Sequence, residues 1–103
     1  MYSEDTEYER RERLSAKCSE LARVAMDQGD IDTWRRLTRH QVRLDLLQIT
    51  TNRLNYPEWF EYGLEHPDER AAEAFRATKE FIQMVEQTGG RDLIESAGLV
   101  DLL

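Results

Sequence analysis

The sequence predicts an all-α protein, a small antiparallel bundle of three main helices at about residues 4–28, 31–55 and 67–88, with two short helices at about 57–65 and 91–97. Apolar residues recur at helical spacing over long stretches. The two prolines and most of the five glycines fall between those stretches, where they punctuate helices. A hydrophobic content of 40% beside a charged content of 34% is typical of helix-rich folded protein. The length of 103 residues predicts a single domain, residues 1–103.

The first expected helix runs from about Glu4 to Gln28, with Ser3 as a candidate N-cap. Up to Arg13 it consists almost entirely of charged residues, so residues 1–12 are expected to protrude or fray. Beyond that point one face becomes apolar, and we expect this face to pack on a ridge of the next helix. Its members are Leu14, Cys18, Leu21, Ala22 and Ala25.

The second expected helix, residues 31–55, is the element around which the chain is organised. Gly29 and Asp30 supply a C-terminal glycine and an N-cap, and a break this short predicts an antiparallel hairpin. At 100° per residue the helix has two apolar ridges, so it is expected to lie between neighbours on both sides. One ridge comprises Leu37, Leu44, Leu47 and Leu54, and the other comprises Ile31, Val42, Leu46 and Ile49. Between them lie a polar arc of Thr38, Gln41, Asp45, Gln48 and Asn52 and a basic arc of Arg35, Arg36, Arg39, His40 and Arg43.

The next segment is the most aromatic part of the chain. Pro57 ends the long helix and suits the first position of a short helix at about 57–65. The aromatic side chains have two interpretations: they plug the open end of the hairpin, or they anchor a partner, since aromatic residues dominate interface hot spots. They are Tyr56, Trp59, Phe60 and Tyr62.

The third main helix is expected to begin at Pro67 and to end before Gly89. Its inward stripe makes it the candidate neighbour for the second ridge of the central helix. The stripe comprises Ala71, Ala74, Phe75, Thr78, Phe81, Ile82 and Val85. After the short helix at 91–97, four large aliphatic residues close the chain and either complete the core or dock in a groove of a partner. They are Leu99, Val100, Leu102 and Leu103.

The net charge of −7 is unevenly distributed along the chain. Residues 30–54 carry three acids and five bases, a net charge of +2, whereas residues 55–103 carry eleven acids and four bases, a net charge of −7. These two regions are therefore expected to face each other, within one molecule or between copies. The acidic balance argues against general nucleic-acid binding, which needs a basic surface.

A single cysteine, Cys18, allows no intrachain disulfide and is most simply a small core residue in a reducing compartment. No apolar run approaches the length of a membrane-spanning helix, and the charged N-terminus is unlike a signal peptide. We therefore expect a cytoplasmic protein that does not enter a membrane.

No motif in the sequence combines the groups that catalysis or metal binding requires. The two histidines, His40 and His66, are not spaced as metal ligands, and no base lies beside Cys18 in the sequence. Glycine-rich phosphate loops and nucleophile elbows are also missing. The sequence therefore predicts no enzyme activity, no catalytic residue, no metal and no cofactor.

These observations predict a non-enzymatic protein-binding regulator, meaning an inhibitor, adaptor or assembly factor, with another protein as its partner. One attractive subclass blocks a nucleic-acid-handling complex with its acidic surface. The alternatives are a structural homo-oligomer, such as a homodimer assembled through the central helix, and a weak nucleic-acid binder. Candidate partner-binding residues are the arginine stripe Arg35, Arg36, Arg39 and Arg43, the aromatic residues Trp59, Phe60 and Tyr62, and the aliphatic residues Leu99, Val100, Leu102 and Leu103.

Overall fold

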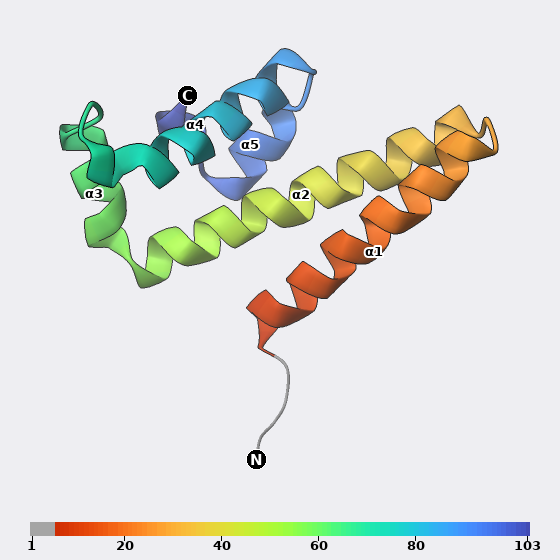
Figure 1. The fold of residues 1–103 in the computed structure, drawn as a ribbon, viewed down its shortest axis with the longest axis horizontal. Coiled ribbons are helices and arrows are strands. Elements are labelled where there is room, and N and C mark those ends of the chain that lie inside the picture. Colours follow the sequence, from red (N-terminus) through yellow and green to blue (C-terminus); the bar gives the residue numbers. More distant parts are fainter. Residues whose placement is uncertain (1–5) are drawn as a thin grey trace. The chain divides into compact units, whose positions relative to one another are not determined.

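A computed structural model describes residues 6–103, which form an all-α protein of the small helical-bundle class with no strand in this range (Figure 1). The predicted fold class is confirmed. The helices are α1 (Glu7–Asp27), α2 (Ile31–Asn55), α3 (Pro57–Glu65), α4 (Glu73–Gln87) and α5 (Arg91–Ala97). Two short 3-10 helices, η1 (Arg70–Ala72) and η2 (Val100–Leu102), precede α4 and follow α5.

The chain divides into two compact units, an N-terminal unit of residues 1–48 and a C-terminal unit of residues 49–103. The boundary falls inside α2, so this helix contributes about five turns to the first unit and about two to the second. Each unit is described by itself below. The expectation of a single domain stays a prediction.

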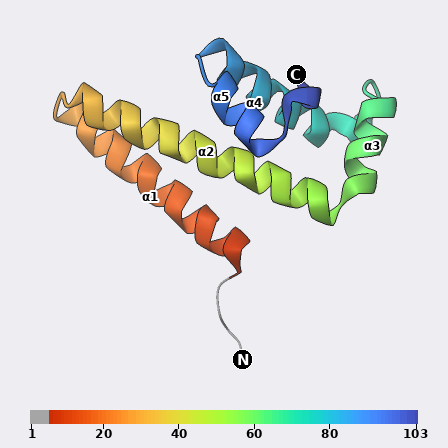
Figure 2. The same ribbon diagram turned by 180° about the vertical axis from the view of Figure 1, so that it is seen from behind.

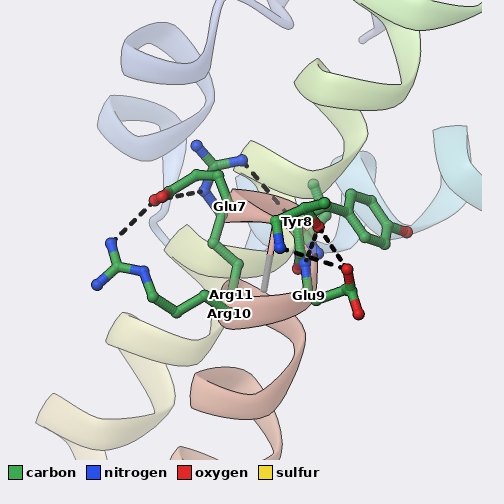
Figure 3. A network of polar contacts seen from close by, with 7 residues as sticks. Glu7, Tyr8, Glu9, Arg10 and Arg11 are labelled. Atoms are coloured by element: carbon green, nitrogen blue, oxygen red, sulfur yellow. Dashed lines mark hydrogen bonds and ion pairs between the residues drawn. The ribbon is translucent and has the colours of Figure 1, made fainter. Parts of the chain in front are cut away.

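The N-terminus of α1 is closed by a reciprocal capping box. The Thr6 hydroxyl accepts from the Glu9 N–H at 3.1 Å, and the Glu9 carboxylate accepts from the Thr6 N–H at 3.3 Å. The predicted cap Ser3 and the predicted start at Glu4 lie outside the described residues. Figure 3 shows the Glu7 carboxylate beside the guanidinium groups of Arg10, at 2.9 Å, and Arg11, at 3.9 Å.

The beginning of α1 contacts α2. Gln48 donates from its side-chain nitrogen to the carbonyl of Tyr8 at 2.7 Å, and Arg11 is half-buried. Tyr8 and Arg11 therefore contact α2, and the expectation that residues 1–12 protrude or fray stays a prediction. The remainder of that stretch, residues 1–5, lies outside the described residues.

The turn between α1 and α2 matches the prediction. Gly29 has φ +75°, a left-handed conformation that costs glycine little, and the Asp30 N–H reaches back to the Ala25 carbonyl at 2.9 Å. The Asp30 carboxylate then accepts from the Thr33 N–H at 3.2 Å and caps α2. Hydrogen bonds from the Thr33 side chain and from its backbone N–H hold the pKa of Asp30 below its usual value.

The structure buries only part of the apolar stripe that was expected on α1. The residues of α1 that are buried are small: Cys18, Ala22 and Ala25, whereas Leu14 and Leu21 remain 40% and 42% exposed. The Ser15 hydroxyl donates to the Asp45 carboxylate at 2.7 Å, so the polar arc of α2 takes part in the contact with α1. Small side chains let the two backbones approach each other, and this close approach leaves the larger leucines at the edges of the interface.

In the C-terminal unit, α4 contacts both α3 and α5 (Figure 2). Gly63 on α3 lies against the ring of Phe75 on α4, and a Cβ atom placed on Gly63 would lie 2.4 Å from the Phe75 Cγ. The rings of Phe60 and Phe75 meet edge to face at 5.9 Å. Other buried residues of this unit are Ala72, Ile82, Val85, Ile94, Ala97, Leu99 and Leu102.

The start of the third main helix was predicted wrongly. Pro67 lies in a turn, and α4 begins at Glu73 after the 3-10 turn η1, where the prediction placed one continuous helix from residue 67. Arg76 explains this turn, because its Nη1 atom donates to the carbonyls of Pro67 at 2.7 Å and of Glu69 at 2.9 Å. The tighter η1 winding buries Ala72, while the expected inward residues Ala71 and Ala74 are exposed.

The end of the chain folds back on α2. Gly98, at φ +72°, ends α5, and the Leu99 N–H donates to the Ile94 carbonyl at 3.1 Å. The Thr50 hydroxyl donates to the Ala97 carbonyl at 2.7 Å, and Arg53 pairs with Asp101. These two polar contacts tie the end of α2 to α5 and η2, and the expectation that the third main helix covers the second ridge of α2 stays a prediction.

Candidate protein-binding site

An aromatic cleft lies at the corner between α2 and α3. It has a volume of about 290 Å³ and is lined by Asn52, Tyr56, Trp59 and Phe60. The proline at the start of α3 creates this corner, because the chain leaves the helical conformation at Tyr56, which has φ −134° and ψ 60°. The Tyr56 N–H closes the last turn of α2 on the Asn52 carbonyl at 2.8 Å. The cleft is therefore built from consecutive turns of one local segment.

The three rings of the cleft have different degrees of burial. Phe60 is 2% exposed, Trp59 is 39% exposed and Tyr56 is 63% exposed. The Trp59 ring meets Phe60 edge to face at 4.8 Å and Phe75 at 6.0 Å. The indole is thus held in one orientation by two core rings while more than a third of its surface stays accessible.

The Phe60 ring contacts an ion pair formed by Arg53 and Asp101. The Arg53 guanidinium lies 5.9 Å from the centre of the Phe60 ring, within range of a cation–π interaction. Two of its nitrogens donate to the two carboxylate oxygens of Asp101, one of them at 2.9 Å. This pairing lowers the pKa of Asp101 and raises the pKa of Arg53 from their usual values.

Three of the residues that line the cleft carry polar groups with no hydrogen-bond partner in the described part of the chain. Among residues 6–103, the Asn52 carboxamide, the Tyr56 hydroxyl and the Trp59 indole N–H have no side-chain hydrogen bond. Asn52 is half-buried, where an unpaired amide is costly unless water or a ligand satisfies it. The cleft therefore combines an apolar floor with a few unused donors and acceptors, as ligand-binding sites do.

Of the three predicted aromatic residues, the structure brings two together in the cleft and places the third elsewhere. Trp59 and Phe60 line the cleft, but Tyr62 does not: it stacks on His66 at 4.4 Å and donates its hydroxyl to Glu69. That hydrogen bond raises the pKa of Tyr62. Sequence reasoning missed the role of Asn52, although its position one helical turn before Tyr56 was a signal that could have been used.

The terminal aliphatic residues are mostly core. Leu99 and Leu102 are fully buried, Leu103 is half-buried, and Val100 is 38% exposed. Of the two interpretations of this segment, burial favours closure of the core.

The arginine stripe lies on an exposed face of α2 in the N-terminal unit. Arg35, Arg36, Arg39 and Arg43 are all exposed. Arg36 donates to the Thr33 hydroxyl at 3.4 Å, whereas Arg35 and Arg43 have no ion-pair or hydrogen-bond partner among residues 6–103. These two guanidinium groups are accessible to an anionic partner.

Within the described part of the chain, no group of three or more His, Cys, Asp and Glu side chains is arranged to hold a metal ion. None of the described helices is long and apolar enough to span a bilayer. The chain was compared with protein-family models, curated proteins and solved structures, and none of them matches it.

Proposed function

We propose that this chain is a non-enzymatic protein-binding regulator, an inhibitor, adaptor or assembly factor, that captures its partner at the aromatic cleft. The observation that carries the proposal is the Trp59 indole, which two core rings hold in place while 39% of its surface is exposed. Aromatic anchors of this kind account for a large share of the binding energy in protein interfaces. A side chain that is already ordered also loses little conformational entropy on binding.

The charge of the C-terminal unit indicates the kind of surface that its partner presents. Residues 49–103 carry eleven acids and five bases, a net charge of −6. A basic rim on the partner complements this charge and accelerates association. The basic surface of a nucleic-acid-handling protein has this character, which supports the inhibitor subclass with a cytoplasmic partner of that type.

Capture from a lysate of the source organism tests the proposal. The full chain is immobilised beside two variants, Trp59→Ala and the matched control Met84→Ala, which removes an apolar side chain that is 56% exposed on α4 of the same unit. We expect one or more proteins to bind the wild-type chain and Met84→Ala at physiological salt, with a loss of about tenfold or more in Trp59→Ala. Circular dichroism establishes that each variant is folded. The absence of any retained protein, or equal retention by all three chains, contradicts the proposal.

A homo-oligomer is a second candidate, because Leu54 on the leucine ridge of α2 is 78% exposed. Leu37 and Leu47 are half-buried and Leu44 is buried, so the available seam is concentrated near the end of the helix. Light scattering separates this candidate from the first. A strict monomer at micromolar concentration eliminates it, whereas a dimer that Leu54→Ser dissociates supports it.

Weak nucleic-acid binding is a third candidate, favoured by the accessible guanidinium groups of Arg35 and Arg43. It requires an affinity that falls steeply with salt, since phosphate neutralisation releases counterions. Reversing the charges of Arg35, Arg36, Arg39 and Arg43 abolishes an electrophoretic shift if this candidate is correct. A shift that persists after the reversal eliminates it.

A further inference from the structure

We propose that the aromatic cleft binds an extended, proline-rich segment of the partner protein that carries a lysine or arginine at its flank. This inference rests on the proposed function and specifies the chemistry of the ligand. It follows from three observations: the unused hydrogen-bonding groups of the cleft residues, the Arg53 guanidinium that already lies over the Phe60 ring, and the negative charge of α3.

The unused hydrogen-bonding groups distinguish an extended ligand from a helical one. Trp59 and Asn52 line the cleft, and among residues 6–103 neither the indole N–H nor the carboxamide has a hydrogen-bond partner. A helix that docks here brings backbone carbonyls that are already bonded within the helix. A polyproline II segment has no internal hydrogen bonds, so each of its carbonyls is open to a donor. The cleft donors therefore match an extended chain.

The Phe60 ring argues for an apolar group in the cleft. The face of this ring is already engaged by the Arg53 guanidinium at 5.9 Å, and Asp101 neutralises that cation. A second cation would find this face of the Phe60 ring already occupied and would gain no cation–π contact there. A pyrrolidine ring is apolar and compact, and a proline-rich segment loses little conformational entropy when it binds. Proline thus suits the cleft better than a lysine or arginine side chain does.

The charge of α3 places the basic residue of the ligand at its flank. Glu58 and Glu61 are exposed on the helix that supplies Trp59 and Phe60, and the C-terminal unit as a whole carries eleven acids against five bases. A lysine or arginine next to the prolines gains attraction from these carboxylates without entering the cleft. The same carboxylates repel the phosphate backbone of a nucleic acid.

Peptide titration of the full chain tests this inference. The probe is a blocked peptide of one arginine followed by eight prolines. The chain has two tryptophans, so the Trp34→Phe background leaves Trp59 as the only indole, and its fluorescence reports occupancy of the cleft. We expect a saturable change in Trp59 fluorescence with a dissociation constant between about 10 µM and 1 mM, the range of a small single-site contact. Replacing the arginine by glutamate weakens binding severalfold, and this difference shrinks as salt is added.

Three comparisons make the result specific. Tyr56→Ala removes a ring that is 63% exposed and has no side-chain hydrogen bond, so it leaves the fold intact and weakens binding about tenfold or more, as calorimetry measures. Trp59→Phe keeps a ring and removes the N–H, and it weakens binding severalfold. The matched control Val100→Ala, at a residue 38% exposed on η2, leaves the affinity unchanged.

The outcomes separate the ligand class from the general function. No saturable binding of the proline peptide, or equal binding of a glycine-serine peptide with the same arginine, overturns the inference. Tighter binding of an apolar helical peptide or of single-stranded DNA overturns it in favour of those ligands. If the proline peptide fails while the lysate still yields a protein whose capture depends on Trp59, the inference is wrong and the proposed function survives. If both fail, the proposed function fails as well.

Discussion

At the scale of single residues, Gly63 allows α3 and α4 to approach each other. A Cβ atom at this position would lie 2.4 Å from the Phe75 Cγ, and Phe75 is 2% exposed and unable to move freely. We expect Gly63→Ala to lower the free energy of unfolding by about 1–3 kcal/mol through overpacking, although alanine regains up to about 1 kcal/mol of helix propensity. Urea denaturation measures the change. The exposed neighbour Glu61→Ala serves as the control, and a Gly63→Ala chain as stable as that control would disprove the close contact.

A second prediction for a single residue concerns Asp101 and pH. Arg53 lowers the pKa of Asp101 in the folded chain, so the pair stabilises the fold above the unfolded pKa of about 3.9, and this stabilisation is lost as pH falls through the folded pKa. Because the carboxylate is largely exposed, we expect no more than about 1 kcal/mol. Asp101→Asn therefore destabilises the chain at pH 7 and is neutral at about pH 2 or below. A stability difference that is constant from pH 7 to pH 2 contradicts this assignment, and Asp68→Asn on an exposed turn is the control.

At the scale of elements, small residues determine how α1 packs on α2. Ala25 is 4% exposed in this interface, whereas Leu21 on the same helix is 42% exposed. We expect Ala25→Leu to lower the free energy of unfolding by about 1–3 kcal/mol, because a larger side chain separates the helices. Leu21→Ala should cost less than about 1 kcal/mol. Thermal unfolding of both variants measures the difference, and the reverse order of stabilities would contradict an interface built from the small residues of α1.

The residues at which the helices begin and end were more predictable than the helix faces that are buried. Asp30, Gly29 and Pro57 act through their own backbone neighbourhood, so the sequence located the ends of α2 and α3 correctly. The face of α1 that packs on α2 depends on how closely two backbones approach each other. Hydrophobic periodicity does not contain this distance. It placed Leu14 and Leu21 on the same packing face as the small residues, and the structure buries only the small ones. The turn before α4 depends on Arg76 reaching back to Pro67, a contact that no local pattern predicts.

The candidate site was predictable in part. The density of aromatic residues singled out Trp59 and Phe60 as candidates. It did not predict that Trp59 is 39% exposed and Phe60 only 2% exposed. That difference depends on how α3 packs against α4, where Phe75 supports both rings. Leu99 and Leu102 turned inward because Gly98 ends α5 in a left-handed conformation, which the sequence indicated only as a break.

At the scale of the whole molecule, the central claim is that another protein binds at the corner between α2 and α3. Site-directed photo-cross-linking tests this claim most directly. A benzophenone amino acid replaces Tyr56, which is 63% exposed at the cleft, or Met84, which is 56% exposed on α4. Irradiation in lysate is predicted to give a discrete adduct from position 56 that Trp59→Ala removes, and none from position 84. Equal adducts from both positions, or no adduct from position 56, would contradict the claim.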